Sequence, residues 1–243
     1  MVEYRTIFIS DVHLGTAGCK DKYLLDFLKN NSSDNLYLVG DILDFWKLKS
    51  SWCWTKGHNE VLRRILKISK KTNVVYVPGN HDEIIREFIP INFGDIQIVR
   101  DASYTSLNGK KHLVFHGDDF DFIVRKYKWI AIVGSFLYEF LLKLNTINAW
   151  VRRQFNLPYW SLSKYLKHKA KQAVNFIHSF EKAAVKHARE KGYEGLICGH
   201  IHRAMATKIE GIDYYNCGDW VESCTAIVET KKGEFKIIEW IKN

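Results

Sequence analysis

Five short apolar runs recur along the chain, and each of them ends at a polar residue. The runs are rich in β-branched and aromatic residues, which is typical of buried strands. They are TIFIS before Asp11, NLYLV before Gly40-Asp41, NVVYV before Gly79-Asn80, HLVF before His116 and GLIC before Gly199-His200. Stretches of helical periodicity at 20–30 and 58–71 separate the first three runs, which favours β-α-β units. The pattern therefore predicts an α/β fold.

The pattern changes between His116 and Gly199. Residues 126–144 are apolar with Lys at both ends, and residues 163–192 have the periodicity of a long basic helix. We expect a core of residues 1–121 and 192–243, interrupted by a basic helical lid at 122–191. The tail from 205 to 241 predicts meandering strands with turns at EGID and KKGE.

The charge of the chain is concentrated in this predicted lid. Residues 122–191 hold 14 Lys/Arg and 3 Asp/Glu, a net charge of +11, whereas the whole chain carries +9. Such a segment should meet an anionic partner, which could be a phosphate-bearing substrate, nucleic acid or an acidic lipid surface. The alternative is a solvated helix face without a partner.

Composition also bears on the compartment. No run of about 18 uncharged apolar residues is present to span a bilayer. The five cysteines are an odd number without a C-x-x-C pair, which favours a reducing compartment and packing thiols. We therefore expect a cytoplasmic protein, either free or attached to the inner membrane surface through the lid.

The polar residues behind the five runs form one chemically coherent set. They are Asp11-x-His13, Gly40-Asp41-x-x-Asp44, Gly79-Asn80-His81-Asp82, His116-Gly117-Asp118 and Gly199-His200-x-His202. Any one of these could be an ordinary polar turn, but together they offer imidazole, carboxylate and amide ligands, which suit manganese, iron or zinc. A carboxylate can bridge two cations about 3.5–4 Å apart, and such a pair binds phosphoryl oxygens and acidifies water. The set predicts two-metal hydrolysis of a phosphoester.

This set of motifs resembles the calcineurin-like metallophosphoesterase superfamily over about Asp11 to His202. The resemblance implies a four-layer αββα sandwich with a helical lid insertion and two divalent metal ions, with manganese expected and iron or zinc as alternatives. It implies that one ion is held by Asp11, His13, Asp41 and His202, and the other by Asp41, Asn80, His116 and His200. In that family the histidine matching His81 faces the scissile phosphate and assists the leaving oxygen, oriented by the acid matching Asp44. We expect Asp82 and Glu83 to favour the N-terminus of a helix at EIIREF through its dipole.

A narrower resemblance rests on HGDDFD, the basic insert, ICGHIHRA and NCGDWVESCTAIVE. These stretches are similar to bacterial UDP-2,3-diacylglucosamine diphosphatases, which cleave a lipid-linked sugar nucleotide to UMP and lipid X in lipid A synthesis. The best-known enzymes of that branch carry Arg at the position of His81 and lack the GDWVES tail. In the predicted lid, Lys164, Lys167, His168 and Lys171 are candidates for substrate binding because their spacing would place them on one face of the predicted helix.

Two other functions fit parts of the sequence. A nuclease or cyclic-nucleotide phosphodiesterase would use the same core, but the basic residues are interleaved with aliphatic and aromatic stretches, which disfavours nucleic acid as a partner. A non-catalytic scaffold of the same fold is disfavoured because all seven ligand candidates and His81 are present. The sequence does not fix an oligomeric state.

Overall fold

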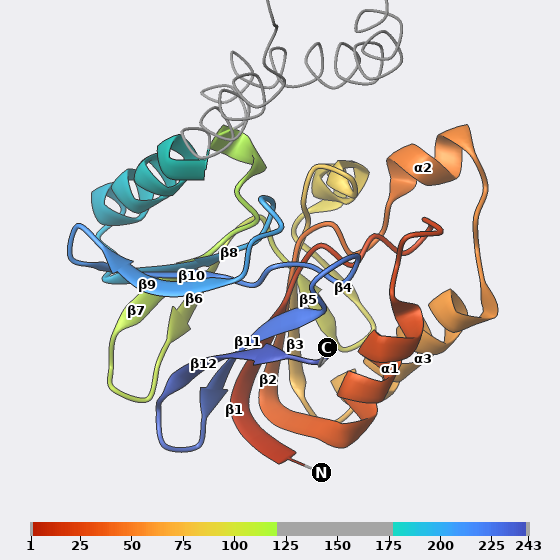
Figure 1. Ribbon diagram of the computed structural model, residues 1–243, viewed down its shortest axis with the longest axis horizontal. Helices are drawn as coiled ribbons and strands as arrows, with labels where there is room; N and C mark the ends of the chain where they lie inside the picture. The colour runs from red at the N-terminus through yellow and green to blue at the C-terminus, as the bar shows by residue number, and fades with distance from the viewer. Residues whose placement is uncertain (1, 121–176, 242–243) are drawn as a thin grey trace, which may run out of the picture. The chain divides into compact units, whose positions relative to one another are not determined.

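The structure, a computed structural model, describes residues 2–120 and 177–241 (Figure 1). Contacts within the chain separate two units, one formed by residues 1–118 with 184–243 and the other by residues 119–183. The four lid residues predicted to bind substrate, Lys164, Lys167, His168 and Lys171, lie outside the described residues. So does most of the predicted lid, whose boundaries at 122 and 191 stay a prediction.

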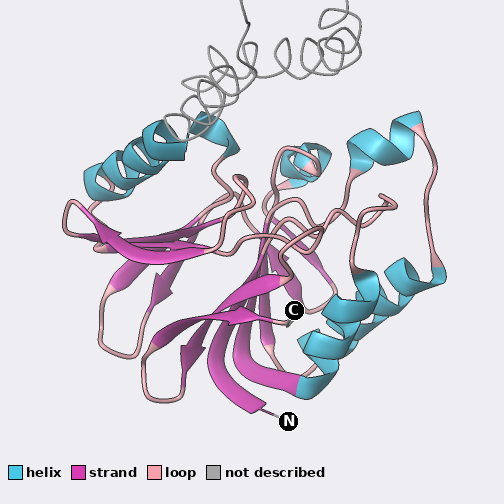
Figure 2. Cartoon of the chain, viewed as in Figure 1, coloured by secondary structure: helices cyan, strands magenta, loops and turns pink. Residues whose placement is uncertain are grey.

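The first unit contains two β-sheets (Figure 2). The seven-stranded sheet has the order β12-β11-β1-β2-β3-β5-β4, and the five-stranded sheet has the order β6-β7-β8-β10-β9. The strands of the first sheet are β1 (Val2–Ile9), β2 (Asn31–Val39), β3 (Asn73–Val77), β4 (Ile91–Phe93), β5 (Ile96–Ile98), β11 (Thr225–Thr230) and β12 (Phe235–Glu239). Those of the second are β6 (Ala102–Thr105), β7 (Lys111–Val114), β8 (Gly195–Cys198), β9 (Met205–Ile209) and β10 (Ile212–Asn216).

The central strands of both sheets are parallel, which brings their polar carboxyl ends together. β1 pairs with β2 and β2 with β3 in parallel, and in the other sheet β7 pairs with β8 and β8 with β10 in parallel. The five predicted strand runs are thus β1, β2, β3, β7 and β8. Their polar residues all follow the carboxyl end of a strand, where open α/β sheets place their ligands.

Alternate side chains of the seven-stranded sheet enter two different cores. Phe8, Tyr37 and Val75 pack with Tyr104 and Ile197 in the core that lies between the sheets. Their sequence neighbours, among them Ile7, Leu36 and Val74, point to the opposite face and pack there in the core under the helices. This alternation is the period of two that a strand imposes, and here both faces are apolar because both are covered.

Helices complete the layers. The structure has α1 (Asp21–Asn30), α2 (Phe45–Ser50), α3 (Lys56–Ser69) and two 3-10 helices, η1 (Glu83–Phe88) and η2 (Asp118–Phe120). Figure 1 shows α1 and α3 side by side on the outer face of the seven-stranded sheet. Leu24, Phe27 and Leu28 of α1 and Val61 and Ile65 of α3 are buried there, at the spacing of one helical face.

The outer face of the five-stranded sheet is covered by helical residues 184–190. Ala184, Val185 and Ala188 are fully buried, and the ring of His187 lies 5.9 Å from that of Phe115, just after β7. The predicted four-layer αββα sandwich is confirmed. The helical lid insertion that was predicted with it lies outside the described residues.

Two details differ from the sequence prediction. The tail is not one meander, because β9 and β10 form a hairpin in the five-stranded sheet while β11 and β12 form one in the other. The turns predicted at EGID and KKGE close these two hairpins. EIIREF is a short 3-10 helix instead of an α-helix. Among the described ranges, none of the helices combines the length and apolarity that crossing a bilayer would take.

Candidate metal centre

The loops that carry the predicted ligands have an unusual backbone conformation. Five of the seven predicted metal ligands have a left-handed backbone, with φ of 52° at Asp11, 53° at His13, 53° at Asp41, 72° at His200 and 52° at His202. Residues other than glycine rarely adopt this conformation, which costs about 1–3 kcal/mol each and persists where the surroundings demand it. The fold therefore holds these five residues in a locally strained backbone conformation.

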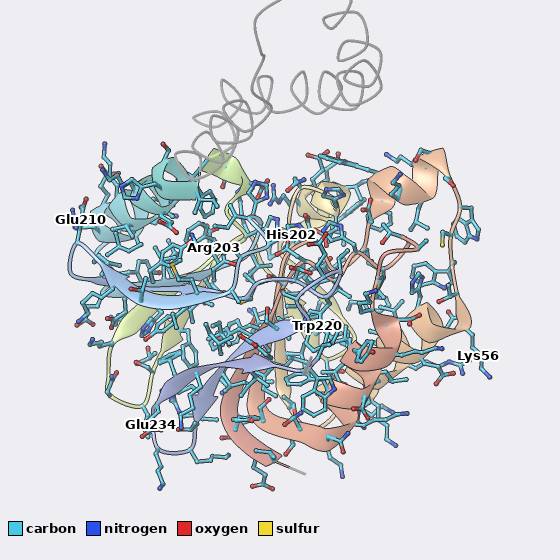
Figure 3. All side chains as sticks on the ribbon, viewed as in Figure 1. Lys56, His202, Arg203, Glu210, Trp220 and Glu234 are labelled. Carbon is cyan, nitrogen blue, oxygen red and sulfur yellow. The ribbon has the colours of Figure 1, made fainter. Side chains whose placement is uncertain are left out.

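One group of side chains comes from the loops after β1 and β8. Asp11, His13 and His202 each offer a ligand atom, and these atoms all lie within 4.8 Å of one another. Nε2 of His202 lies 3.3 Å from Oδ1 of Asp11, and Nε2 of His13 lies 4.0 Å from the same oxygen. His202 is the exposed member of the group, and Figure 3 labels it among the loops at the strand ends. These three side chains could hold one cation.

A second group joins both sheets. Asp41, His116 and His200 also bring their ligand atoms within 4.8 Å of one another. Nδ1 of His116 is 3.0 Å from the carbonyl oxygen of Val39, which can only accept, so Nδ1 carries the proton of that hydrogen bond. Nε2 of His116 therefore faces Oδ2 of Asp41, at 3.3 Å, and is the nitrogen available to a cation.

Asp41 lies between the two groups. Its Oδ2 is 3.3 Å from Nε2 of His116 and 3.9 Å from Nε2 of both His13 and His81. Burial alone would raise the pKa of this carboxyl, but the imidazoles of His116, His81 and His13 outweigh it and hold the pKa below its usual range. Against the opposing effect of burial, Asp41 in turn raises the pKa of His116 to about 10. A single carboxylate is thus shared by histidines on both sides.

Asp44 lies between two imidazoles. Its Oδ2 lies 3.1 Å from Nδ1 of His13 and 3.0 Å from Nδ1 of His81, while Oδ1 accepts the backbone N–H of Lys47 and caps α2. Burial opposes the ionised form, but His13 and His81 hold the pKa of Asp44 below its usual range. Because Nδ1 of His81 faces Asp44, its Nε2 is directed toward Asp41 and the centre of the site.

Several buried polar atoms of the predicted ligands have no protein partner among the described residues. Within the described ranges, Oδ1 of Asp11, Nε2 of His13, Oδ1 of Asn80 and Nε2 of His116 are buried without a hydrogen bond. Leaving such an atom unsatisfied costs about 1–3 kcal/mol, and buried polar atoms are otherwise almost always paired. Four of the predicted ligands each present one such atom, and a mixed set of nitrogen and oxygen donors suits borderline divalent ions. The residues therefore fit divalent metal ions.

The glycines in these loops have two different roles. Gly40 has φ of 80°, which a side chain disfavours, and a Cβ there would also meet the ring of His116. Gly79 and Gly199 are needed for space, because a Cβ at Gly79 would meet the Asp41 carboxylate and one at Gly199 would meet Asp11 and Ser10. These two positions let neighbouring strand ends approach closely enough to share one site.

The sequence predicts that Asp82 favours the N-terminus of a helix through its dipole. The structure shows a different role for this residue. It is fully buried and makes no capping hydrogen bond to η1. Its carboxylate accepts the backbone N–H groups of Gly79, Ile42 and Leu43 and the hydroxyl of Tyr76. The Asp82 carboxylate therefore connects the loop that carries Asp41 with the turn that carries Asn80.

We expect Asp82→Asn to destabilise the protein by about 3 kcal/mol or more, because an amide N–H₂ would face backbone donors that now meet a carboxylate. Denaturant unfolding of the metal-free protein measures this difference. Asp95→Asn is the matched control, since Asp95 is exposed, and it should change the free energy of unfolding by less than about 0.5 kcal/mol. A loss below about 1 kcal/mol for Asp82→Asn would show that the carboxylate is dispensable.

Other contacts at the site were not predicted from the sequence. Arg86 donates to both carboxylate oxygens of Asp118, at 2.7 Å each, and to the carbonyl oxygen of Pro78. It thereby ties the end of β3 to the loop after β7. The sequence could have indicated Asp118, because it stands two residues after His116 in HGDDFD. Nothing in the sequence indicated Arg86. Asp219, from the GDWVES stretch, lies 4.0 Å from Nδ1 of His202.

The chain is similar to several known proteins. A family model described as calcineurin-like phosphoesterase matches residues 4–204. Two curated relatives are named UDP-2,3-diacylglucosamine hydrolase. The one from Psychromonas ingrahamii is 26% identical over 96% of this chain and 96% of its own length, and the one from Neisseria meningitidis serogroup B is 28% identical over 91% and 92%. Among solved structures, the E. coli phosphoesterase Yfce covers 97% of this chain and 99% of its own at 13% identity and a TM-score of 0.46.

These findings confirm the resemblance to both the superfamily and the diacylglucosamine branch. The fold of this family implies divalent metal ions, and the groups around Asp11 and Asp41 are candidates to hold them. The family match covers most of the chain, including strands of both sheets and all the strand-end loops up to His202. The protein therefore belongs to the calcineurin-like phosphoesterase family and is a hydrolase of that family.

Proposed function

We propose that this protein is a hydrolase with two divalent metal ions that cleaves the pyrophosphate bond of UDP-2,3-diacylglucosamine, giving UMP and lipid X. The observation that carries the metal chemistry is the convergence of Asp11, Asp41 and four histidines from two sheets. The substrate is supported by relatives of matching length that are named UDP-2,3-diacylglucosamine hydrolase. A place in lipid A synthesis follows from that substrate.

In this proposal Asp11, His13, Asp41 and His202 hold one ion, and Asp41, Asn80, His116 and His200 hold the other. Asp41 serves both ions, which its position between the two groups supports. Two such ions supply positive charge to the phosphoryl oxygens and acidify water. We expect manganese, with iron or zinc as alternatives, because the donors mix nitrogen and oxygen.

His81 acts on the leaving oxygen in this proposal. Its Nδ1 faces the Asp44 carboxylate, and its Nε2 lies 3.9 Å from Oδ2 of Asp41, at the centre of the site. Asp44 thus fixes the ring so that Nε2 can donate a proton to the oxygen that departs. The backbone N–H of His81 also donates to Oδ1 of Asp41, at 2.8 Å, which orients the carboxylate that both ions share.

The predicted lid contributes substrate contacts in this proposal. Its Lys164, Lys167, His168 and Lys171 meet the diphosphate, and its apolar stretches receive the acyl chains at the inner membrane surface. The charge of +11 on residues 122–191 supports this assignment, because a diphosphate and an anionic membrane surface both attract cations.

The experiment that tests the function is hydrolysis of UDP-2,3-diacylglucosamine, followed by phosphorus NMR, with added Mn²⁺ and with a chelator. A generic phosphodiester serves as the reference substrate under the same conditions. We expect kcat/KM for the lipid substrate to exceed that for the diester by orders of magnitude, with UMP as product and no turnover in chelator. Turnover of the diester alone would overturn the lipid substrate and leave the metal chemistry standing.

Metal affinity should increase with pH. Without metal, the raised pKa of about 10 keeps His116 protonated at neutral pH, so a cation that binds Nε2 must displace that proton. Below pH 10, affinity for that ion should therefore fall by about tenfold for each pH unit. Titration calorimetry with Mn²⁺ from pH 6.5 to 8.5, in two buffers of different ionisation enthalpy, measures the affinity and the protons released. An affinity that stays constant over this range, without proton release, would contradict the assignment.

A further inference from the structure

Asn216 is a buried polar residue at the end of β10 that the proposed chemistry does not use. Its side-chain amide makes two hydrogen bonds to the backbone. Nδ2 donates to the carbonyl oxygen of Gly199 at 2.7 Å, and Oδ1 accepts the N–H of Gly218 at 3.0 Å. Because one partner can only accept and the other can only donate, they fix the orientation of the amide. Both ends of the side chain thus hold backbone groups in place.

The carbonyl group of Gly199 closes a strained turn around His200. It also accepts the N–H of Ile201 at 2.9 Å, so this hydrogen bond spans three residues with His200 in the middle. His200 has φ of 72°. A three-residue turn whose central residue has φ near +75° is rare and strained, and such a conformation persists only where its surroundings hold it.

The same turn is held from a second side. The backbone N–H of His200 donates to Oδ2 of Asp11 at 2.9 Å, and the backbone N–H of Trp220 donates to the carbonyl oxygen of Asp11 at 3.0 Å. Trp220, labelled in Figure 3, is fully buried. Residues 216–220 therefore contact the loops after β8 and β1, which carry members of both candidate ligand groups. Within this segment, the side chain of Asn216 bonds to the turn itself.

We propose that Asn216 is a positioning residue for the metal centre. Its hydrogen bond to Gly199 holds the strained turn that keeps the imidazole of His200 in the group with Asp41. The inference rests on the proposed function for the assignment of His200 as a metal ligand. Without the amide, the turn would relax toward a backbone conformation that residues other than glycine prefer. The imidazole would then leave its place, and affinity for the ion at this group would fall.

The test is Mn²⁺ binding to the full-length protein, measured by titration calorimetry in Asn216→Ala, His200→Ala and the double variant. Asn216→Ala should weaken one of the two ions by about 10- to 100-fold, the usual effect of removing a group that orients a metal ligand. In a His200→Ala background it should change the affinity by less than about twofold, because the ligand that it positions is gone. In a His202→Ala background the full effect should remain, because that ligand belongs to the other group.

Asn31→Ala is the matched control. Asn31 is also buried, and its Nδ2 donates to the carbonyl oxygen of Phe27 at 2.8 Å, at the end of α1. Both alanine variants should lower the Tm of the metal-free protein by several degrees, but Asn31→Ala should leave Mn²⁺ binding unchanged. If Asn216→Ala does not fold, Asn216→Ser carries the same test, because it keeps a polar group that is too short to reach both backbone partners.

A loss of affinity as large in the His200→Ala background as in the unmodified protein would show a general structural role and overturn the proposal. Equal weakening of both ions, or an affinity unchanged within about twofold, would overturn it as well.

These measurements need no turnover of the lipid substrate, so they separate the positioning role from the proposed function. If His200→Ala weakens Mn²⁺ and Asn216→Ala does not, the metal centre stands and the positioning role fails. If Mn²⁺ binding depends on both residues but UDP-2,3-diacylglucosamine is not hydrolysed, the positioning role stands and the proposed substrate fails. A His200→Ala protein that binds both ions normally would overturn the ligand assignment and the positioning role together.

Discussion

Replacing Asp41 with alanine should lower kcat for a generic phosphodiester by about 10³-fold or more, which corresponds to a loss of about 4 kcal/mol in transition-state stabilisation. The carboxylate is buried, and its Oδ2 lies 3.3 Å from Nε2 of His116 and 3.9 Å from Nε2 of His13. Because this carboxylate lies between the two candidate groups, its loss should weaken the binding of both ions and not of one alone. Steady-state kinetics with Mn²⁺, together with elemental analysis of the purified variant, measures both effects.

The matched control for this variant is Asp34→Ala. Asp34 is exposed, lies near the start of β2 and pairs with Lys231 on the surface of the first unit. This variant should keep the activity and the metal content of the unmodified protein. Thermal unfolding of Asp41→Ala shows whether the chain is folded. A folded Asp41→Ala protein with more than about a tenth of the original kcat would contradict the shared role of this carboxylate.

His81→Ala should lower kcat by about 10²- to 10⁴-fold while the protein keeps two bound metal ions. The reason is that Nδ1 of His81 lies 3.0 Å from Oδ2 of Asp44, which leaves Nε2 as the nitrogen that can donate a proton to the leaving oxygen. A proton donor matters most when the leaving group is a poor one. The loss should therefore be smaller for a 4-nitrophenyl ester than for an alkyl ester, and kinetics on the two substrates measures this difference.

The structure also makes His81 part of a possible ligand group with His13 and Asp41, so metal content is the decisive control. If His81→Ala binds only one ion, His81 is a ligand and the proton-donor role is wrong. Equal losses for good and poor leaving groups would contradict that role as well. His178→Ala, at an exposed histidine, should change neither kinetics nor metal content.

The sequence was informative about the site because the chemistry follows the carboxyl ends of strands. The runs ending at Asp11, Asp41 and Asn80 are long enough and apolar enough to be identified as strands. Parallel pairing then brings their ends together, which is a property of the fold class. The alternation of the apolar side chains did not show which face meets the helices, because both faces are buried.

Short and non-local features could not be predicted in this way. β4 and β5 have three residues each, which is too few to display a period, and they form through pairing with each other and with β3. Asp82 was misassigned because dipole reasoning considers only the residues next along the chain. Its partners Ile42 and Leu43 lie about 40 residues earlier and reach it only in the folded protein.

The left-handed backbone of the predicted ligands could not be foreseen from the sequence. Glycine marks such a conformation, as at Gly40, but Asp11, His13 and His202 give no signal of it. The strain is imposed by tertiary contacts, for example the hydrogen bonds from the N–H groups of Asp11 and His13 to the loop after β2. The residue types therefore predicted the candidates for the site. Their backbone conformation depends on contacts between loops, which the sequence does not show.

The most direct test of the two-metal site is a crystal structure of the protein soaked in Mn²⁺, with anomalous differences measured above the manganese edge. We predict two anomalous peaks about 3.5–4 Å apart, with the Asp41 carboxylate between them. One peak should lie beside Asp11, His13 and His202, and the other beside Asn80, His116 and His200. A single peak, or two peaks that do not share Asp41, would contradict the account.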